Sequence, residues 1–342
     1  MNILVTGGLG YIGSHVVIEL ISKGFKVEIL DNLSNSDIHT LQKLEVQTKT
    51  KIPLHVVDLR YLSETKNVFR NNRFDGVIHF AGLKAVGESV ANPEIYYDNN
   101  VLGTINLINA MKEISCKKLI FSSSATVYGK PKKLPIDENA ELQAVNPYGE
   151  NKIIIERYLN YLYESDKEWR FSILRYFNPV GGHHSKLFGE NPKGTPNNLM
   201  PFICQVAAGK IEKLKIFGND FKTHDGTGIR DYIHVVDLAR GHTAALNYIL
   251  KNADSITVNL GTGKGYSVLE MVNAFTEINQ ILIPFEYTCR RPGDIDSCYA
   301  DNSLAKKILS WEPKYDLFDM CRDSWESQKN INNLTFKKCL KN

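Results

Sequence analysis

Short apolar runs alternate with longer amphipathic stretches through the first half of the chain. The runs are rich in β-branched and aliphatic residues and predict strands at residues 2–6, 26–30, 54–57, 76–80 and 118–122. Residues 11–22 carry apolar side chains at helical spacing and are followed by Gly24, which is typical of a helix that ends at a glycine. This alternation predicts βαβ units around a buried parallel sheet.

The second half of the chain has a different pattern. Two further strands are predicted at residues 171–176 and 255–260, and residues 181–228 between them are rich in Gly, Pro and Asn. The 342 residues exceed the usual length of one compact core. We therefore expect an α/β fold, with a Rossmann-type doubly wound parallel sheet and a smaller C-terminal α/β domain. The first domain is expected to span residues 1–178 with a late return near 230–262, and residues 179–342 mainly form the second.

Composition narrows the class of protein. A hydrophobic content of 43% and a charged content of 23% are ordinary for a globular chain and argue against a membrane span. The formal charge of +3, without a long basic tract, argues against a nucleic-acid partner. The first residues lack the pattern of a secretory signal, and the six cysteines show no CxxC spacing. We therefore expect a cytoplasmic protein with reduced thiols and no metal site.

A glycine-rich turn follows the first predicted strand. Residues 7–13, Gly-Gly-Leu-Gly-Tyr-Ile-Gly, match both GxGxxG and GxxGxxG. Side chains at these glycines would block a tight turn or the approach of a pyrophosphate, and the helix that follows offers amide donors at its positive end. The pattern alone matches many sequences by chance. Its position between a strand and a helix indicates a dinucleotide site.

Acidic residues follow the second and third predicted strands. Asp31 is placed to accept hydrogen bonds from an adenosine ribose and to repel a 2'-phosphate, which favours NAD over NADP. The alternative is that Asp31 and Asn32 only begin a turn, since turn-forming residues continue to Ser36. Asp58 closes the third strand, where a carboxylate suits the adenine edge.

A serine, a tyrosine and a lysine form the candidate catalytic group. Ser124 closes the fifth strand segment, and Tyr148 and Lys152 are spaced i, i+4 at the start of a helix expected near residues 151–163. A phenol has a reference pKa near ~10, and a neighbouring ammonium or a cationic cofactor would lower it. Tyr148 could then remove a proton from a hydroxyl. A Tyr/Lys pair on an exposed helix often has no function, but this pair follows a strand of a nucleotide-binding sheet.

Several stretches resemble the UDP-galactose 4-epimerases, a family of extended short-chain dehydrogenases/reductases. They are residues 5–8, 11–15, 31–33, 79–89, 97–100, 175–181, 196–201, 216–218, 225–228 and 230–235. Only the last thirty or so residues are nondescript. The resemblance implies NAD as cofactor, UDP-sugars as substrates and a division into an NAD-binding and a UDP-sugar-binding domain.

The family's functional residues transfer to matching positions here. The implied catalytic residues are Ser124, Tyr148 and Lys152. The positions assigned to NAD are Gly7, Gly10, Tyr11, Ile12, Gly13, Asp31, Asn32, Leu33, Ser34, Asn35, Ser36, Asp58, Leu59, Phe80, Ala81, Gly82, Leu83, Lys84, Asn99, Ser124, Tyr148, Lys152 and Phe177. The positions assigned to the UDP-sugar are Lys84, Ser124, Tyr148, Asn178, Asn198, Leu199, Phe217, Arg230, Tyr232, Arg291, Asp294 and Cys298.

The implied reaction is the reversible 4'-epimerisation of UDP-glucose and UDP-galactose through a 4-keto sugar. Cys298 stands where some relatives carry a tyrosine that excludes N-acetylated sugars, so UDP-GlcNAc and UDP-GalNAc are expected substrates as well. The alternative is an ordinary buried cysteine. A related 4,6-dehydratase would carry an acidic pair where this chain has Ala125 and Thr126, and a non-catalytic NAD sensor would have no reason to keep the catalytic group.

Two helices carry more apolar residues than one face against a sheet requires. They are expected at residues 100–114 and 151–163. Relatives pair through equivalent helices, so a homodimer is expected. The alternative is a helix pair that is fully covered within one chain.

Overall fold

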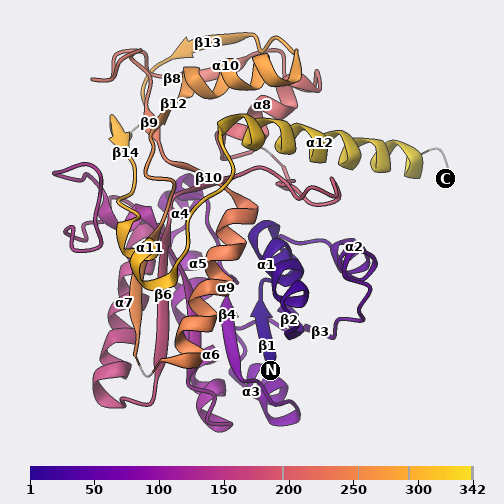
Figure 1. Cartoon of the computed structure of the whole chain (residues 1–342), viewed down its shortest axis with the longest axis vertical. Coiled ribbons are helices and arrows are strands. Elements are labelled where there is room, and N and C mark those ends of the chain that lie inside the picture. Colours follow the sequence, from indigo (N-terminus) through magenta and orange to yellow (C-terminus); the bar gives the residue numbers. More distant parts are fainter. Residues whose placement is uncertain (195, 253, 292, 340–342) are drawn as a thin grey trace.

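The computed structural model describes residues 1–194, 196–252, 254–291 and 293–339, with side chains up to residue 331. Seven strands form its central sheet (Figure 1): β1 (Asn2–Thr6), β2 (Lys26–Asp31), β3 (Leu54–Val56), β4 (Gly76–His79), β5 (Lys118–Ser124), β6 (Arg170–Tyr176) and β11 (Ile256–Leu260). Their order is β11-β6-β5-β4-β1-β2-β3, and every neighbouring pair is parallel. The predicted doubly wound sheet is confirmed.

Helices cover both faces of this sheet. One face packs against α1 (Tyr11–Ser22), α2 (His39–Thr48), α9 (Val235–Lys251) and α11 (Ser303–Leu309). The other face packs against α3 (Leu62–Asn71), α6 (Gly103–Glu113) and α7 (Pro147–Ser165). Short helical segments connect these elements: α4 (Val86–Ala91), α5 (Pro93–Tyr96), a π-helix (Tyr97–Leu102) and a 3-10 turn (Ala125–Tyr128).

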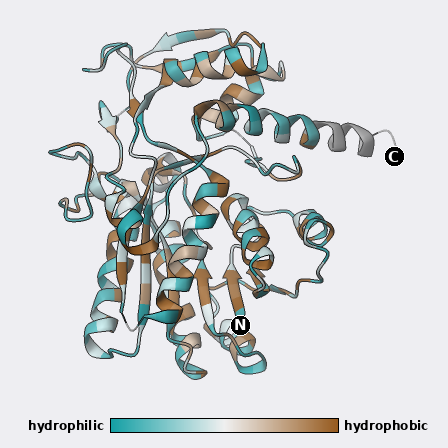
Figure 2. Ribbon diagram, viewed as in Figure 1, coloured by the Kyte–Doolittle hydropathy of each residue, from teal (hydrophilic) through white to brown (hydrophobic). Residues whose placement is uncertain are grey.

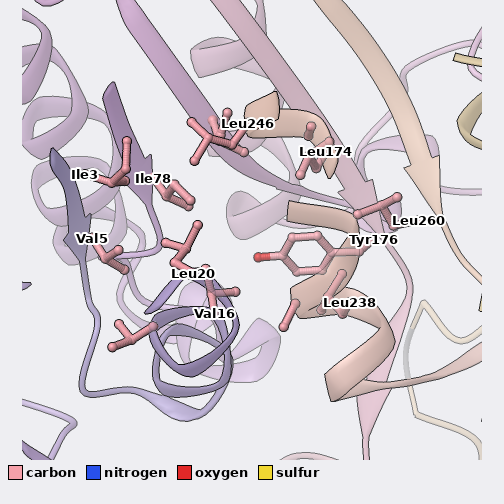
Figure 3. Close-up of a cluster of buried hydrophobic side chains, with 14 of the residues drawn as sticks. Ile3, Val5, Val16, Leu20, Ile78, Leu174, Tyr176, Leu238, Leu246 and Leu260 are labelled. Atoms are coloured by element: carbon pink, nitrogen blue, oxygen red, sulfur yellow. The ribbon is translucent and has the colours of Figure 1, made fainter. Parts of the chain in front are cut away.

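The alternation of side chains along β1 divides the core into two clusters. Ile3 and Val5 point to one face, where they pack with Val16 and Leu246 from α1 and α9 (Figure 3). Leu4, between them in sequence, belongs to the cluster on the opposite face. Both faces of a parallel sheet covered by helices must be apolar, which explains the continuous hydrophobic run in the sequence. Central strands are largely brown, whereas the helices that cover them alternate between teal and brown (Figure 2).

Smaller sheets and further helices lie beyond one end of the central sheet (Figure 1). The paired strands are β7 (Asn178–Val180) with β10 (Tyr232–His234), β8 (Leu214–Phe217) with β13 (Phe285–Thr288), and β9 (Ile229–Arg230) between β12 (Tyr266–Ser267) and β14 (Ser297–Cys298). The helices are α8 (Leu199–Ala207), α10 (Val268–Asn279) and α12 (Leu317–Cys339). These elements share a separate apolar core that includes Ile203, Phe275 and Met320.

The chain returns to the central sheet late in the sequence. Strand β11 pairs with β6 along its whole length, from Ile256 beside Ser172 to Leu260 beside Tyr176. Helix α9, which precedes β11, packs beside α1 in the first cluster. The segment between β6 and α9 is therefore anchored at both of its ends to the central sheet.

Candidate functional site

The glycine-rich turn after β1 forms a close-packed cradle. A Cβ atom on Gly7 would lie 2.8 Å from the backbone nitrogen of Ala81, and Gly7 has φ +66°. A Cβ atom on Gly13 would lie 2.3 Å from the carbonyl oxygen of Gly7. No side chain of the described residues caps the start of α1 by a hydrogen bond, so its first amides face outward as donors. This geometry fits the pyrophosphate of a dinucleotide.

A cavity opens beside this cradle at the carboxyl ends of β1, β2 and β4. Its predicted lining residues are Gly7, Gly10, Asp31, Asn32, Ser34, Asn35, Ser36, Asp58, Leu59, Phe80, Ala81, Gly82, Leu83 and Asn99. Leu30 and Val57 also line it, and the sequence reasoning missed both. Each directly precedes an acidic residue that follows a predicted strand, so the position of that acidic residue could have indicated that its neighbour also lines the cavity.

Other residues assigned to NAD lie around the cavity instead of in its wall. Ile12 packs against the first core cluster, and Phe177 lies in a fourth cluster, which includes Ile153 next to Lys152. The Tyr11 hydroxyl donates to the carbonyl oxygen of Gly181 at 2.8 Å, so this side chain links the cradle to the second half of the chain. Leu33 has φ +62° and belongs to the turn after β2.

Asp31 organises the turn and lines the cavity. Its Oδ1 accepts from the Leu33 amide at 3.0 Å and from the Ser36 hydroxyl at 2.7 Å. Its Oδ2 accepts from the Leu9 amide at 3.1 Å and keeps a second lone pair for a ligand hydroxyl. The turn interpretation and the cofactor interpretation are therefore compatible.

Asp58 is held in its ionised form in the wall of the cavity. Its carboxylate accepts from Arg60 Nη2 at 2.8 Å and from Asn32 Nδ2 at 3.0 Å. The hydrogen bonds from Arg60 lower the pKa of Asp58 to about 2. The carboxylate is therefore charged at neutral pH and can accept hydrogen bonds from a ligand.

The candidate catalytic residues meet where β5 ends and α7 begins. Asn146 caps α7 by accepting from the Gly149 amide at 2.8 Å, which places Tyr148 in the first turn. Lys152 Nζ donates to the Ser122 carbonyl oxygen at 2.7 Å and lies 5.6 Å from the centroid of the Tyr148 ring. The Ser124 side chain hydrogen-bonds the Tyr148 phenol.

Burial dominates the acid–base properties of this group. It raises the pKa of Tyr148 to about 12, although the hydrogen bond with Ser124 acts to lower this pKa. It lowers the pKa of Lys152 to about 8, although the negative charge of Glu156 acts to raise this pKa. Within the chain alone, loss of solvation therefore dominates the pKa of Tyr148, and its lowering by the Lys152 ammonium together with a cationic cofactor stays a prediction. A further positive charge from a ligand is needed to favour the phenolate.

A buried ion pair lies directly behind the catalytic group. Glu156 accepts from Arg175 Nη2 at 2.6 Å and from the Ser123 hydroxyl at 2.5 Å. Glu156 therefore fastens α7 to β5 and β6, the strands that end at the site. Sequence reasoning missed this residue, although it lies one helical turn after Lys152 on the same face.

Residues assigned to the UDP-sugar gather in the second half of the chain. Arg291 pairs with Asp294 through two hydrogen bonds of 3.0 and 3.3 Å, and Arg230 Nη2 lies 3.9 Å from the same carboxylate. The guanidinium of Arg291 lies 4.8 Å from the centroid of the Phe217 ring. Two arginines beside an aromatic ring suit a diphosphate attached to a base.

Short strand pairs join this group to the catalytic end of the sheet. Cys298 in β14 pairs with Arg230 in β9, and Tyr232 in β10 pairs with Asn178 in β7. Cys298 is buried in the cluster that contains Phe177 and Val127. Burial raises the pKa of its thiol to about 11, so Cys298 acts as a small apolar side chain.

Three residues with predicted roles remain, and two of them share one partner. Lys84 Nζ and Asn198 Nδ2 each lie 2.8 Å from Oε1 of Glu190. Leu199 begins α8 directly after Asn198. No sequence motif pointed to Glu190, since its role depends on two segments that are far apart in the chain.

Comparison with known proteins agrees with this geometry. The profile of a family described as GDP-mannose 4,6 dehydratase matches residues 4–324. A UDP-glucose 4-epimerase of Bacillus subtilis (strain 168) is 52% identical, covering 97% of this chain and 98% of its own.

Among the described residues, no helix is long and apolar enough to cross a membrane.

Two solved structures have nearly the same fold. One is a UDP-glucose 4-epimerase from Stenotrophomonas maltophila with bound NAD and formylated UDP-arabinopyranose, at 46% identity and a TM-score of 0.96, covering 98% of this chain and 99% of that chain. The other is a UDP-glucose 4-epimerase from Bifidobacterium longum in complex with NAD+ and UDP, at 47% identity and a TM-score of 0.94, covering 97% and 99%. The chain therefore belongs to the UDP-glucose 4-epimerase family, within the extended short-chain dehydrogenases/reductases.

Proposed function

We propose that this protein interconverts UDP-glucose and UDP-galactose by reversible 4'-epimerisation with tightly bound NAD. The observation that carries the proposal is the meeting of Ser124, Tyr148 and Lys152 at the carboxyl end of β5, on the same edge of the sheet as the dinucleotide cavity. A relative that is 52% identical to this chain is named UDP-glucose 4-epimerase. The dehydratase alternative is disfavoured because Ala125 and Thr126 supply no acid or base.

The catalytic group moves one proton at the sugar. The Tyr148 phenolate removes the proton of the 4'-hydroxyl, and Ser124 holds that hydroxyl in line. Lys152 stabilises the phenolate with its ammonium. Bound NAD supplies the acceptance and return of hydride at C4', and its positive ring favours the phenolate. The 4-keto sugar then turns to present its other face before the phenol returns the proton.

Binding through the nucleotide end permits this turn. Arg230 and Arg291 hold the diphosphate, and Phe217 offers its ring to the uracil. Affinity placed on the UDP end leaves the hexose free to rotate between two productive orientations. Asp294 orients both guanidinium groups when it pairs with them.

The experiment is to incubate purified protein with UDP-galactose, without added cofactor, and to follow products by proton NMR. UDP-glucose should form, and a 4'-deuterium label should stay on the sugar. Loss of the label to solvent or to free NADH would contradict the closed hydride transfer. Formation of a 4-keto-6-deoxy sugar would instead support a dehydratase.

We further propose that the sugar pocket accepts UDP-GlcNAc and UDP-GalNAc. Cys298 is smaller than the tyrosine that some relatives carry, and it lies in the cluster beside Phe177. We also propose that residues 1–178, with the return near 230–262, bind NAD and that residues 179–342 mainly bind the UDP-sugar.

We propose that the protein is a cytoplasmic homodimer. Apolar side chains remain exposed along the π-helix and α7, where dimerisation would cover them: Leu102 is 41% exposed and Tyr161 is 72% exposed. Exposed apolar residues that gather on neighbouring helices are typical of a protein interface.

A further inference from the structure

Glu190 connects the cofactor side of the site to the substrate side. Its Oε1 is 2.8 Å from Lys84 Nζ and 2.8 Å from Asn198 Nδ2. Lys84 directly follows Leu83, which lines the dinucleotide cavity, and Asn198 directly precedes α8. The carboxylate therefore joins a segment that borders the dinucleotide cavity to the segment that begins α8, and both of its partners are residues assigned to ligands.

The second oxygen of this carboxylate has no protein donor. The Glu190 side chain is 10% exposed, and its Oε2 is buried without a hydrogen-bond partner among the described residues. Tyr11, which lines the same small cavity, donates its hydroxyl to Gly181 and so does not supply the donor. A buried carboxylate oxygen without a donor is unfavourable, so an arriving group should satisfy it.

We propose that Glu190 is a ligand-contacting residue of this site: its Oε1 positions Lys84 and Asn198, and its Oε2 accepts a hydrogen bond from a bound ligand. This inference rests on the proposed epimerase function. The ligand group must be a hydrogen-bond donor, because a phosphate oxygen would be repelled by the carboxylate. The proposed ligands offer two such donors, a hexose hydroxyl and the nicotinamide carboxamide.

The test compares Glu190→Gln with the wild-type holoenzyme and with Glu141→Gln as a matched control. Glu141 is an exposed glutamate whose side chain pairs with Lys132, so its replacement removes an equivalent lysine contact away from the site. For each protein one measures kcat and KM for UDP-galactose, the calorimetric affinity for UDP, and the NAD content per chain.

Glu190→Gln should differ from both other proteins. If a hexose hydroxyl is the donor, KM for UDP-galactose rises about tenfold or more, as expected for a lost bond to a charged acceptor. Affinity for UDP and NAD content then stay near the wild-type values, since neither involves the hexose. If the carboxamide is the donor, the NAD content of the purified protein falls while UDP affinity stays unchanged. Either result supports the proposal.

Two results would overturn it. Kinetics and NAD content equal to those of wild type would mean that Oε2 only binds water in the small cavity. An equal loss of affinity for UDP and UDP-galactose would mean that Glu190 acts only through Lys84 and Asn198. If Glu190→Gln melts well below wild type, the same comparison is made with Glu190→Asp, which keeps the charge and shortens the reach. Failure of the wild-type protein to convert UDP-galactose would instead contradict the proposed function.

Discussion

At the residue scale, Tyr148 has the least exchangeable role in the proposed reaction. Its side chain is partly buried, and loss of solvation raises the pKa of the phenol to about 12, so the proton stays on until a ligand brings positive charge. Replacing Tyr148 with Phe should lower kcat by about 10²- to 10⁴-fold, the usual contribution of a positioned acid–base group. UDP affinity, measured by calorimetry, should change little.

Tyr61→Phe is the matched control, because Tyr61 is 56% exposed and lies at the start of α3. Its kcat should equal that of wild type. Retention of most activity by Tyr148→Phe would show that another group takes the proton.

The pocket proposal makes Cys298 the residue that decides whether acetylated sugars fit. Cys298→Tyr adds a large ring next to Phe177, in the cluster that both residues share. We expect UDP-GalNAc turnover to fall more than about tenfold while UDP-galactose turnover is kept within a few fold, because steric exclusion acts on the larger substrate. Chromatography of the 4'-epimers measures both rates.

Cys298→Val is the control for this change, since it replaces the thiol with a side chain of similar size. Both substrates should still convert. Unchanged UDP-GalNAc turnover in Cys298→Tyr would make Cys298 an ordinary buried cysteine.

Asp58 makes stability depend on acid pH. Arg60 lowers the pKa of Asp58 to about 2, below its ordinary value of 3.8. A depressed carboxyl pKa stabilises the fold fully above the ordinary pKa, and this stabilisation is lost as pH falls from about 3.8 toward 2. Because the Arg60 side chain is 37% exposed, solvent screening limits the stabilisation from the Asp58–Arg60 pair to on the order of 1 kcal/mol.

The check is thermal melting of wild type and Asp58→Asn at pH 7, 4 and 3. Wild type should melt higher at pH 7, and the gap should narrow as the pH falls below 4. A gap that is constant across this range would show that the Arg60 contact contributes no charge-dependent stability.

At the scale of elements, the start of α1 depends on one close contact. A Cβ on Gly13 would lie 2.3 Å from the Gly7 carbonyl oxygen, so Gly13→Ala must push the helix away from the turn. We expect this variant to lose most of its bound NAD, since the amide donors move away from the pyrophosphate. NAD released on denaturation, measured per chain, reports the change.

Gly87→Ala tests whether any helical glycine would give this result. Gly87 lies in α4, and a Cβ there would meet nothing within 4 Å in the described part of the chain. Its NAD content should match wild type. Full NAD content in Gly13→Ala would refute the close-packing explanation.

At the scale of the whole molecule, the proposed dimer covers the exposed apolar side chains of the π-helix and α7. Tyr161 is 72% exposed, so Tyr161→Glu should leave the single chain folded while placing a charge in the interface. Sedimentation should find wild type as a dimer and this variant shifted toward monomer. Tyr287→Glu, on exposed β13, should remain dimeric. A wild-type monomer at micromolar concentration would contradict the proposal.

Local patterns predicted much of this protein. The bounds of β1 and α1 agree with the structure to the residue, because a buried strand and a helix leave unambiguous periodicities. Strand β5 continues to Ser124, two residues beyond the prediction, since its serines remain paired in the sheet. Most residues expected at the cofactor cavity line it, because parallel strands bring their carboxyl ends to one edge.

The sequence by itself thus determined the sheet, the glycine cradle and the candidate catalytic residues, because each depends on short-range spacing. Only the tertiary structure decided the electrostatics of the site. The high pKa of Tyr148 follows from burial by elements that are remote in sequence. The contacts of Glu190 with Lys84 and Asn198, and of Glu156 with Arg175, join separate segments that only the folded sheet brings together. Loss of solvation and long-range contact have no local signature in a sequence, so these features required the fold.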